Sequence, residues 1–359
     1  MKVLLVDLET EWRGGQNQAL LLLKGLQARG HAAELVAPLA GELQKRACAA
    51  GIPVHAVPRN FRRARAAAKI SRLTKTQNYS IVHANEPHAL TAAWLARAHR
   101  RAPLLVSRRV GYPISRNWFA RLRYDAAARI VAISRWSAER VIRSGIAESK
   151  LAIVYEGIEI PARPSGEQRA QARARWRVPA DAPLLGCVGV LSPDKGQEWL
   201  IRALAELRKK FPSAKLLLAG DGPCRQRLQR LAQEVGIADA VIFAGFISDV
   251  ENAYAALDVF LLPSFFEALS NALMSAMAYA IPSVAFKVGG PAEIIEDSKS
   301  GLLVEPGNVE ALRSAISKIL DDAALASSVG ENGRRRIEQD FTAAKMVGEM
   351  LDVYEECLA

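Results

Sequence analysis

Short apolar runs alternate with longer amphipathic segments along the whole chain. Each run of about four to eight residues rich in Val, Ile and Leu is followed by a turn rich in Gly, Asp, Ser or Pro, and then by a segment with helical spacing. This rhythm is typical of parallel βαβ units, whose strands are buried on both faces. The sequence therefore predicts an α/β protein built on parallel sheets.

The predicted strands form two sets. In the first set, we expect strands within residues 3–8, 33–38, 52–58, 80–85, 103–110, 129–134 and 152–157. In the second set, we expect them within residues 183–191, 215–221, 241–246, 258–264, 282–287 and 301–306. Residues 158–183 separate the sets with four prolines and alternating charges, which favours a linker that includes a short helix.

A chain of 359 residues is too long for one typical core, so two doubly wound, Rossmann-like domains are expected. The first should span residues 1–160 and the second residues 161–340, with a terminal amphipathic helix at about 341–359. Two such sheets facing a cleft would bind a ligand at the carboxyl ends of their strands.

Composition narrows the class of protein. No apolar run approaches the ~18 residues that a membrane-spanning helix needs, and acidic residues follow the first apolar run where a signal peptide would carry small ones. The four cysteines show neither CxxC nor Cys/His spacing, so no disulfide framework or zinc site is suggested. These features favour a soluble protein of the reducing cytoplasm.

The charge is distributed unevenly. Residues 1–160 carry 26 Lys and Arg against 11 Asp and Glu, about +15, whereas residues 161–359 carry 22 against 26, about −4. Arginine clusters lie at 59–72, 97–109 and 116–123. They form either a solvated basic face or a surface for an anionic partner such as lipid headgroups or a phosphorylated glycan. No nucleic-acid-binding module accompanies them.

Glycines and cations stand where loops turn into helices. Gly14 and Gly15 follow the first strand, so their backbone N–H groups could approach a phosphate, although they could also merely permit a tight turn. Lys195 precedes a helix in the second half and could hold a diphosphate as a point charge. Asp221 occupies a turn after the next strand. Pro291 follows two glycines at a further predicted helix start.

The stretch FFEALSNALMSAMA places a carboxylate at the start of a helix. Glu267 precedes a helix expected to begin near Ser270, whose free N–H groups at 269–272 would face the same space. Ser275 lies eight residues after Glu267, on roughly the same side of the helix. A carboxylate and several anion-friendly helix starts therefore converge on one edge of the second sheet.

The run FEALSNALMSAMAYAIPSVAFKVGGPAEIIEDSKSGLLVEPGNVEAL resembles the signature block of family 4 glycosyltransferases. GVLSPDKG, AGDGP, AGFISDV and the early WRGGQ loop occur in the family's order. The resemblance implies the GT-B fold, a nucleotide-sugar donor bound mainly by the second domain, an acceptor bound mainly by the first, and transfer with retention. It also implies that the last helix returns to the first domain and that neither a metal nor another cofactor is needed.

The resemblance also assigns residues. Glu267 matches the first acid of the E-x7-E pattern, which contacts the donor sugar, and Lys195 matches the lysine that neutralises the diphosphate; these are the expected catalytic residues. The expected donor-binding residues are Gly14, Gly15, Asp221, Phe246, Ile247, Ala268, Leu269, Ser270, Asn271 and Ser275. The expected acceptor-side residues are Arg13, Gln16, His83, Arg108 and Arg109.

The chain departs from the family pattern at three places. Ser275 replaces the second acid, which ordinarily binds the ribose hydroxyls, and Val190 replaces an arginine near the diphosphate. Where many members carry a histidine after the fifth strand, this chain has Ser107, Arg108 and Arg109. Either these arginines take an electrostatic role facing a phosphate or the activity is altered. His83 ends a strand and is either an acceptor-side residue or a histidine satisfied by its neighbours.

The functional expectation is a retaining glycosyltransferase. It would move a sugar from a nucleotide diphosphate sugar, with UDP favoured, to a glycan or lipid-linked acceptor that is anionic, in the synthesis of lipopolysaccharide or another envelope polysaccharide. Its basic first domain could contact the inner face of the cytoplasmic membrane. The alternative is an impaired or non-catalytic sugar-nucleotide-binding protein. A GT-B epimerase or phosphorylase would lack the second-domain signature.

Overall fold

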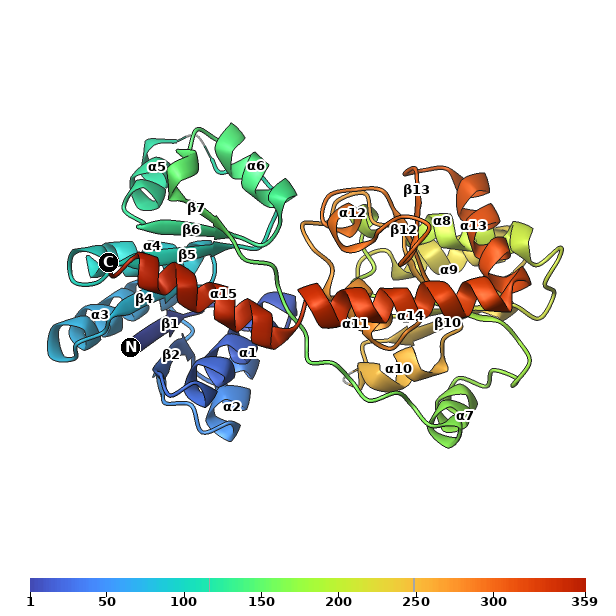
Figure 1. Ribbon diagram of the computed structural model, residues 1–359, viewed down its shortest axis with the longest axis horizontal. Helices are drawn as coiled ribbons and strands as arrows, with labels where there is room; N and C mark the ends of the chain where they lie inside the picture. Colours follow the sequence, from blue (N-terminus) through green and yellow to red (C-terminus); the bar gives the residue numbers. More distant parts are fainter. Residues whose placement is uncertain (116, 248) are drawn as a thin grey trace. The chain divides into compact units, whose positions relative to one another are not determined.

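The computed structural model describes residues 1–115, 117–247 and 249–359 of the chain (Figure 1). These residues form two compact units, the first comprising Met1–Gly157 with Thr342–Ala359 and the second Ile158–Phe341. Each unit is a parallel sheet with helices on both faces. The chain passes from one unit to the other close to the positions expected at residues 160 and 340.

Unit 1 contains a seven-stranded parallel sheet in the order β3-β2-β1-β4-β5-β6-β7. Its strands are β1 (Lys2–Val6), β2 (Ala32–Pro38), β3 (Val54–Val57), β4 (Ile81–Ala84), β5 (Leu104–Arg108), β6 (Arg129–Ala132) and β7 (Leu151–Ile153). Its helices are α1 (Gly14–Ala28), α2 (Glu42–Ala49), α3 (Arg62–Thr76), α4 (Pro87–Leu95), α5 (Trp118–Asp125), α6 (Arg135–Arg143) and α15 (Ala343–Glu356), with short 3₁₀ turns at Ala98–Arg100 and Glu148–Lys150.

Unit 2 contains a six-stranded parallel sheet in the order β10-β9-β8-β11-β12-β13. Its strands are β8 (Leu184–Val188), β9 (Lys215–Ala219), β10 (Val241–Gly245), β11 (Val259–Leu262), β12 (Ser283–Phe286) and β13 (Leu302–Val304). Its helices are α7 (Gly166–Arg175), α8 (Gln197–Leu207), α9 (Arg225–Glu234), α10 (Val250–Ala256), α11 (Asn271–Ala278), α12 (Pro291–Ile294), α13 (Val309–Asp321) and α14 (Ala323–Asp340), with 3₁₀ turns at Pro193–Lys195 and Ala238–Ala240.

Every predicted strand segment overlaps a strand of the structure. The central strands β1, β4, β11 and β12 are buried almost throughout, as expected for parallel strands covered on both faces. In both sheets the strand order reverses next to the first strand of the unit. This reversal is the switch point where open α/β sheets bind ligands at the carboxyl ends of their strands.

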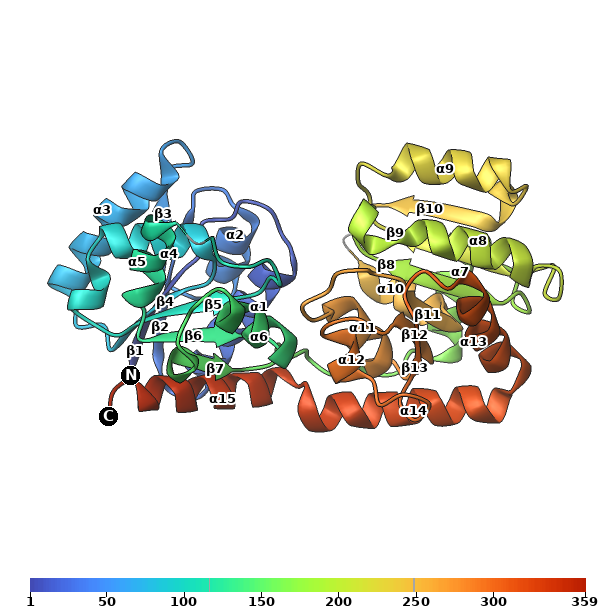
Figure 2. The same cartoon turned by 90° about the horizontal axis from the view of Figure 1, so that it is seen from above.

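The last helix packs on unit 1, as the family resemblance implies. Met346, Val347, Met350 and Tyr354 of α15 are buried in the same core cluster as α1 and α2 (Figure 2). Helices α1 and α15 approach closely because residue 25 is Gly: a Cβ there would lie 2.4 Å from Cγ2 of Val347.

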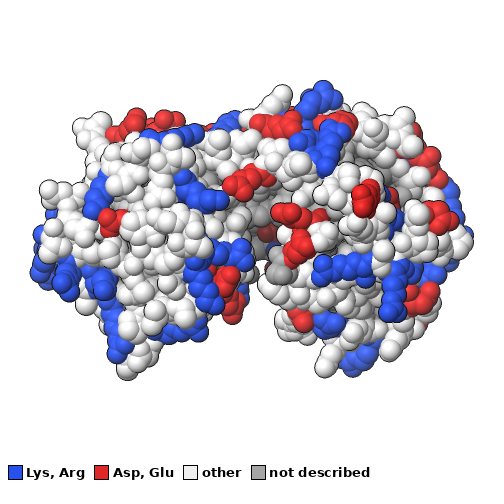
Figure 3. Space-filling model, turned by 90° about the horizontal axis from the view of Figure 1, so that it is seen from below, with Lys and Arg blue, Asp and Glu red and all other residues white. Residues whose placement is uncertain are grey.

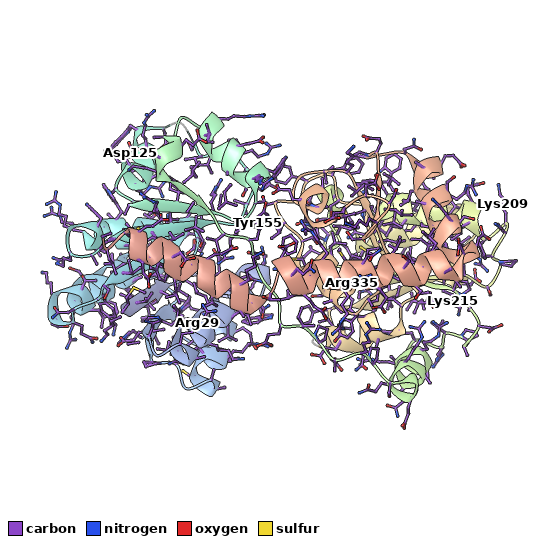
Figure 4. All side chains as sticks on the ribbon, viewed as in Figure 1. Arg29, Asp125, Tyr155, Lys209, Lys215 and Arg335 are labelled. Carbon is purple, nitrogen blue, oxygen red and sulfur yellow. The ribbon has the colours of Figure 1, made fainter. Side chains whose placement is uncertain are left out.

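Arg29, just after α1, fastens the start of α15. It donates a hydrogen bond of 2.7 Å from Nη2 to the carbonyl of Ala344 (Figure 4). The end of the chain is therefore a structural part of unit 1.

The segment predicted as a linker is mostly folded into unit 2. Its helix α7 is capped by Ser165, and Arg173 on this helix is buried. Arg173 donates to the carbonyls of Ala256 and Pro179 and pairs with Asp258. A buried guanidinium with this many acceptors fixes α7 against the end of α10 and the start of β11.

Charge and hydrophobicity follow the sequence expectations in part. Basic side chains predominate over unit 1 on the face drawn in Figure 3, while both signs mix over unit 2. All four cysteines are free, with Cys187 and Cys224 buried. Among the described residues, no helix has both the length and the apolar composition needed to cross a bilayer.

Candidate donor and acceptor site

Lys195 and Glu267, predicted as the catalytic pair, are in contact. Nζ of Lys195 lies 2.6 Å from Oε2 of Glu267. The lysine ends the 3₁₀ turn after β8, and the glutamate lies between β11 and α11. Because β8 and β11 are neighbours in the parallel sheet, their carboxyl ends meet at one edge and bring these side chains together.

Two tight backbone contacts hold this pair in place. Gly196 has a φ of 64°, and a Cβ on it would lie 2.2 Å from the carbonyl oxygen of Pro263, so only glycine fits. The backbone N–H of Phe265 donates to the carbonyl of Asp194 at 2.8 Å. The lysine loop and the glutamate loop are thus locked against each other, which orients both charges before any ligand binds.

Two opposing effects act on the pKa of the Glu267 carboxyl. Burial raises the pKa of its carboxyl, while the neighbouring Lys195 ammonium acts in the opposite direction. The side chain of Lys195 is 26% exposed and that of Glu267 14%. A largely buried acid held by one cation at a sheet edge is a typical functional arrangement, because perturbed carboxyls concentrate at such sites.

The start of α11 behaves as predicted. Ser270 is its N-cap and accepts a hydrogen bond from the N–H of Leu273 at 3.3 Å. Ala268 and Leu269 are buried beneath the loop, whereas Asn271 opens the helix and is partly exposed. The N-cap of the helix therefore lies three residues after Glu267, where the sequence predicts the helix start.

The third predicted helix start is weaker than expected. Helix α12 does begin at Pro291, but it has only four residues and little macrodipole. Its role is packing: a Cβ on Gly290 would lie 2.2 Å from the carbonyl oxygen of Ala268, and the N–H of Gly290 donates to the carbonyl of Glu267. The glycine pair thus supports the glutamate loop from below.

Ser275, in the second acid position, lies near a tyrosine. Its hydroxyl lowers the pKa of the Tyr254 phenol, against the larger effect of burial, and this phenol donates to the carbonyl of Ala272 at 3.3 Å. Burial raises the pKa of Tyr254, whose ring stacks on Tyr279 with centroids 5.5 Å apart. Ser275 remains partly exposed, so a longer side chain at this position would extend from α11 toward the solvent.

The other predicted donor-side residues of unit 2 lie in turns. Asp221 accepts from the N–H of Gly222 at 2.8 Å and pairs with Arg225 at 3.2 Å, so it stabilises its own turn. Phe246 is 74% exposed and Ile247 partly so. Ser248 of the same stretch lies outside the described residues. An aromatic side chain this exposed has surface available for a flat ligand.

In unit 1, the predicted Gly14–Gly15 helix start rests on a buried polar network. Gln16 donates to Asp7 at 3.0 Å, and Asn85 donates both to Asp7 at 2.6 Å and to the carbonyl of Gly15 at 3.1 Å. Burial raises the pKa of the Asp7 carboxyl, and its amide partners oppose the shift. Gln16 is therefore a support of the loop, whereas Arg13 is exposed and paired with Glu11.

Arg109 belongs to the same network. Its Nη1 lies 2.5 Å from Oε1 of Glu156, and its Nε and Nη2 donate to Oδ1 of Asn85 at 3.2 and 2.9 Å. A Cβ on Gly15 would lie 3.2 Å from Cδ of Arg109. This guanidinium is bound by protein acceptors and braces the glycine loop, and its acceptor-side role stays a prediction.

Arg108 is buried as well. Its Nη2 donates to the carbonyl of Tyr112, and the side chain lies under the loop that follows β5. Neither arginine after β5 thus presents an unpaired charge to the solvent.

His83 does not face the solvent edge that its position at the end of β4 suggested. It is fully buried, with Nδ1 2.7 Å from the hydroxyl of Tyr354 and Nε2 2.8 Å from that of Ser107. Burial, followed by the positive charge of Arg109, lowers its pKa to about 3. Of the two alternatives left open for His83, the structure favours a histidine satisfied by its neighbours, and the ring connects the sheet to α15.

Asp7, Asn85, Glu156 and Tyr254 were not predicted. Asp7 and Asn85 directly follow the buried strands β1 and β4, and Glu156 lies shortly after β7. Polar residues immediately after buried parallel strands are a signal that could have found them, because all these ends meet at one edge of the sheet.

Two family models match consecutive parts of the chain. "Glycosyltransferase Family 4" matches residues 12–160, and "Glycosyl transferases group 1" matches residues 168–336. Their order is that of the two units, and together they cover most of the chain. The protein belongs to the family 4 glycosyltransferases, as its second-domain motifs indicate.

Named relatives act on several glycans. The chain is 32% identical to a GDP-mannose-dependent alpha-(1-6)-phosphatidylinositol monomannoside mannosyltransferase of Mycolicibacterium smegmatis, over 62% of this chain and 60% of the relative. It is 33% identical to the lipopolysaccharide core biosynthesis glycosyltransferase LpsE of Rhizobium meliloti, over 54% of this chain and 55% of that one. The chain thus aligns with little more than half the length of these relatives.

Solved structures share the architecture over the whole chain. Anabaena Alr3699/HepE, crystallised with UDP, matches 99% of this chain and 100% of its own with a TM-score of 0.85 and 23% identity. At this identity the match establishes the fold, which is GT-B, as the sequence predicts.

Proposed function

We propose that the protein transfers a sugar from a nucleotide diphosphate sugar to an acceptor hydroxyl with retention of configuration. The observation that carries the proposal is the contact of 2.6 Å between Lys195 and Glu267. In a nucleotide sugar, the sugar hydroxyls and the diphosphate are adjacent, so a carboxylate for the former and an ammonium for the latter must also be adjacent. The start of α11 adds N–H donors to the same edge.

Each residue has a defined role in this reaction. The bond between the anomeric carbon and the phosphate oxygen breaks as the acceptor oxygen attacks from the same face, and the acceptor's proton passes to the departing phosphate oxygen. Lys195 stabilises the charge that develops on the diphosphate, and Glu267 holds the sugar by its hydroxyls. None of these steps requires a metal or a cofactor.

We infer that UDP is the favoured nucleotide. Structural relatives that bind UDP support this choice, while the mannosyltransferase relatives use GDP-mannose. The exposed Phe246 at the end of β10 is the expected surface for the base. The ribose would lie near Ser275, a neutral group where the family has an acid.

The acceptor is expected on unit 1, and we propose a glycan or lipid-linked glycan of the cell envelope. The relative in lipopolysaccharide core synthesis and those that mannosylate phosphatidylinositol monomannoside support this class. The excess of basic side chains on unit 1 supports an anionic acceptor and peripheral contact with an anionic membrane.

A panel of UDP-, GDP- and ADP-sugars tests the proposal. We expect the sugars of one of these three nucleotides to raise the melting temperature of the purified protein, because a ligand that binds the native state stabilises it by mass action. We also expect release of free nucleotide when a suitable acceptor extract is added. Stabilisation without any release of nucleotide would instead favour a sugar-nucleotide-binding protein that does not turn over.

Variants locate the activity. Glu267→Ala should abolish nucleotide release, and full activity in this variant would refute the assigned role. The matched control is Glu206→Ala, which removes a glutamate from an exposed Lys209–Glu206 pair, also 2.6 Å apart, on α8. This control should leave both stabilisation and release unchanged.

A further inference from the structure

A cationic cavity lies on unit 1 between the starts of α3 and α4. It has a volume of about 450 Å³ and is lined by Arg59, Phe61, Arg62, Arg63, His88 and Leu95. We propose that this cavity, the α3 pocket, binds a phosphate group carried by the acceptor. The assignment to an acceptor rests on the function proposed above, whereas phosphate binding itself does not.

Two of the arginines lack protein counterions. Within the described part of the chain, Arg62 and Arg63 make no salt bridge. Both act electrostatically on His88, as does Arg123 of α5, and Arg63 also acts on Arg123. Arginines that make no salt bridge repel one another, so a bound dianion would remove an unfavourable interaction as well as create favourable ones.

The helix start adds to this positive potential. Helix α3 has 15 residues, no acidic residue in its first turn and no side-chain cap. Helices ordinarily place acids there because the N-terminal end carries positive partial charge and unsatisfied N–H groups. Here Arg62 and Arg63 occupy the first turn instead. An external anion is the ligand that both features favour.

The acids nearby do not cancel this charge. Glu86 is turned into the backbone, where its Oε1 accepts from the N–H groups of Ala89 at 2.7 Å and of Leu8 at 3.2 Å. Burial raises its pKa to about 7, so part of its charge is lost near neutral pH. Glu9 also lies near His88: one carboxylate oxygen each of Glu9 and Glu86 and one ring nitrogen of His88 lie within 4.8 Å of one another. Neither acid makes a salt bridge with Arg62 or Arg63 in the described part of the chain.

The pocket also offers an apolar surface. Phe61 is 80% exposed in a left-handed conformation with a φ of 50°, and Leu95 is 51% exposed. Arg59 is held in place by the carbonyls of Leu39 and Ala40. A sugar phosphate fits this combination, because its phosphate can meet the arginines while the apolar face of the ring packs on Phe61.

The location suits an acceptor. Helices α3 and α4 follow β3 and β4, so the pocket lies at the carboxyl edge of the sheet, as does the Gly14–Gly15 loop after β1. Strand β4 adjoins β1, where the strand order reverses. The α3 pocket thus shares the ligand-binding edge of unit 1 with the residues that support the glycine loop.

Binding can be followed at His88. The chain has five histidines, so their imidazole NMR signals can be assigned by single substitutions. We expect glucose 6-phosphate to shift the His88 signal and leave that of the buried His83 unchanged, in the presence of saturating UDP to fill the donor site. Glucose, the neutral control, should have no effect. Equal responses to glucose and glucose 6-phosphate would overturn the proposal.

The decisive variant is Arg62→Gln/Arg63→Gln. It should weaken glucose 6-phosphate binding by about tenfold or more, because charge-assisted hydrogen bonds are lost. Its matched control, Arg72→Gln/Lys75→Gln, removes the same charge from exposed positions at the other end of α3 and should bind as the wild type does. Equal weakening in both variants would mean a nonspecific charge effect and refute the pocket.

A second experiment tests whether the phosphate that binds is carried by a soluble molecule or by a lipid. Sedimentation with phosphatidic acid/phosphatidylcholine vesicles, compared with phosphatidylcholine alone, is measured on the same three proteins. Vesicle binding that needs Arg62 and Arg63, without glucose 6-phosphate binding, supports the pocket with a lipid-borne phosphate. The absence of both kinds of binding overturns it. Phosphate binding in a protein that binds no nucleotide sugar retains the pocket but refutes its assignment to an acceptor.

Discussion

The ammonium of Lys195 lies 2.6 Å from the carboxylate of Glu267, although 72 residues separate them in the chain. Each is therefore the other's counterion in the absence of a ligand. A bound diphosphate would compete with Glu267 for Lys195, and sugar hydroxyls would then satisfy the released carboxylate. The pair thus links recognition of the two halves of a nucleotide sugar.

Substitutions of Lys195 and Glu267 should change UDP binding in different ways. Lys195→Gln should lower the affinity for UDP by about tenfold or more, since a charge-assisted contact to the diphosphate is lost. Glu267→Gln should keep or tighten UDP binding, because Lys195 no longer has a competing partner, while transfer from the UDP-sugar falls by about 100-fold or more. Calorimetry with UDP and initial rates of nucleotide release measure the two effects. Equal loss of UDP affinity in both variants would contradict the division of roles.

Ser275 can be tested by restoring the acid. Ser275→Glu should tighten nucleotide-sugar binding by about tenfold, because a carboxylate can accept charge-assisted hydrogen bonds from the ribose hydroxyls. The loss of the hydroxyl contact with Tyr254 should cost about 1 kcal/mol of stability. Ser275→Gln is the control of equal length without charge. If the glutamate variant binds the donor no better than the glutamine variant, the ribose assignment fails.

The sequence predicted what local patterns and strand ends determine. The strands follow from short apolar runs, and the contact between Lys195 and Glu267 follows from two loops at the carboxyl ends of neighbouring strands. The cap at Ser270 follows from its position before an apolar helix.

The sequence left open the polar partners that distant segments supply. His83 was either an acceptor-side residue or satisfied by its neighbours, and α15 brings Tyr354 to it from 271 residues away. Arg109 similarly finds Glu156, which lies 47 residues further along the chain. A single sequence shows which residues are polar but not which of them satisfy each other, because that depends on the three-dimensional packing of elements remote in sequence.

Protonation of His83 should oppose folding at acid pH. Its pKa is about 3 in the folded protein and about 6.5 in an unfolded chain, so between these values the unfolded state binds more protons. Stability therefore falls as the pH drops through this window, by up to about 1.4 kcal/mol per pH unit from this residue. His83→Gln keeps a group able to hydrogen bond to Tyr354 and Ser107 but cannot take up a proton.

The measurement is thermal unfolding at pH 7.5, 6, 5 and 4 for the wild type and His83→Gln. At pH 7.5 the variant should be less stable than the wild type, because glutamine replaces the contacts of His83 with Tyr354 and Ser107 imperfectly. On acidification it should lose less stability than the wild type does. The partly exposed His31→Gln serves as a control because its side chain is not enclosed in the core. Parallel pH profiles for the wild type and His83→Gln would show that His83 does not stay neutral in the fold.

The Arg109–Glu156 pair should behave as a buried structural bridge. Glu156 is 4% exposed, and Arg109→Gln would leave its carboxylate without a cation, at a cost of about 3 kcal/mol or more. For a unit of this size, that corresponds to a fall in melting temperature of about 6–12 °C. The double variant Arg109→Gln/Glu156→Gln removes both charges and should be more stable than Arg109→Gln alone, because no buried charge remains unpaired.

Arg109 also donates to Asn85, which supports the Gly15 loop. If this loop contacts the diphosphate, both variants should bind UDP more weakly than the wild type does. Melting curves and UDP titrations on the three proteins measure these effects, and an unchanged melting temperature in Arg109→Gln would contradict the structural role of the bridge.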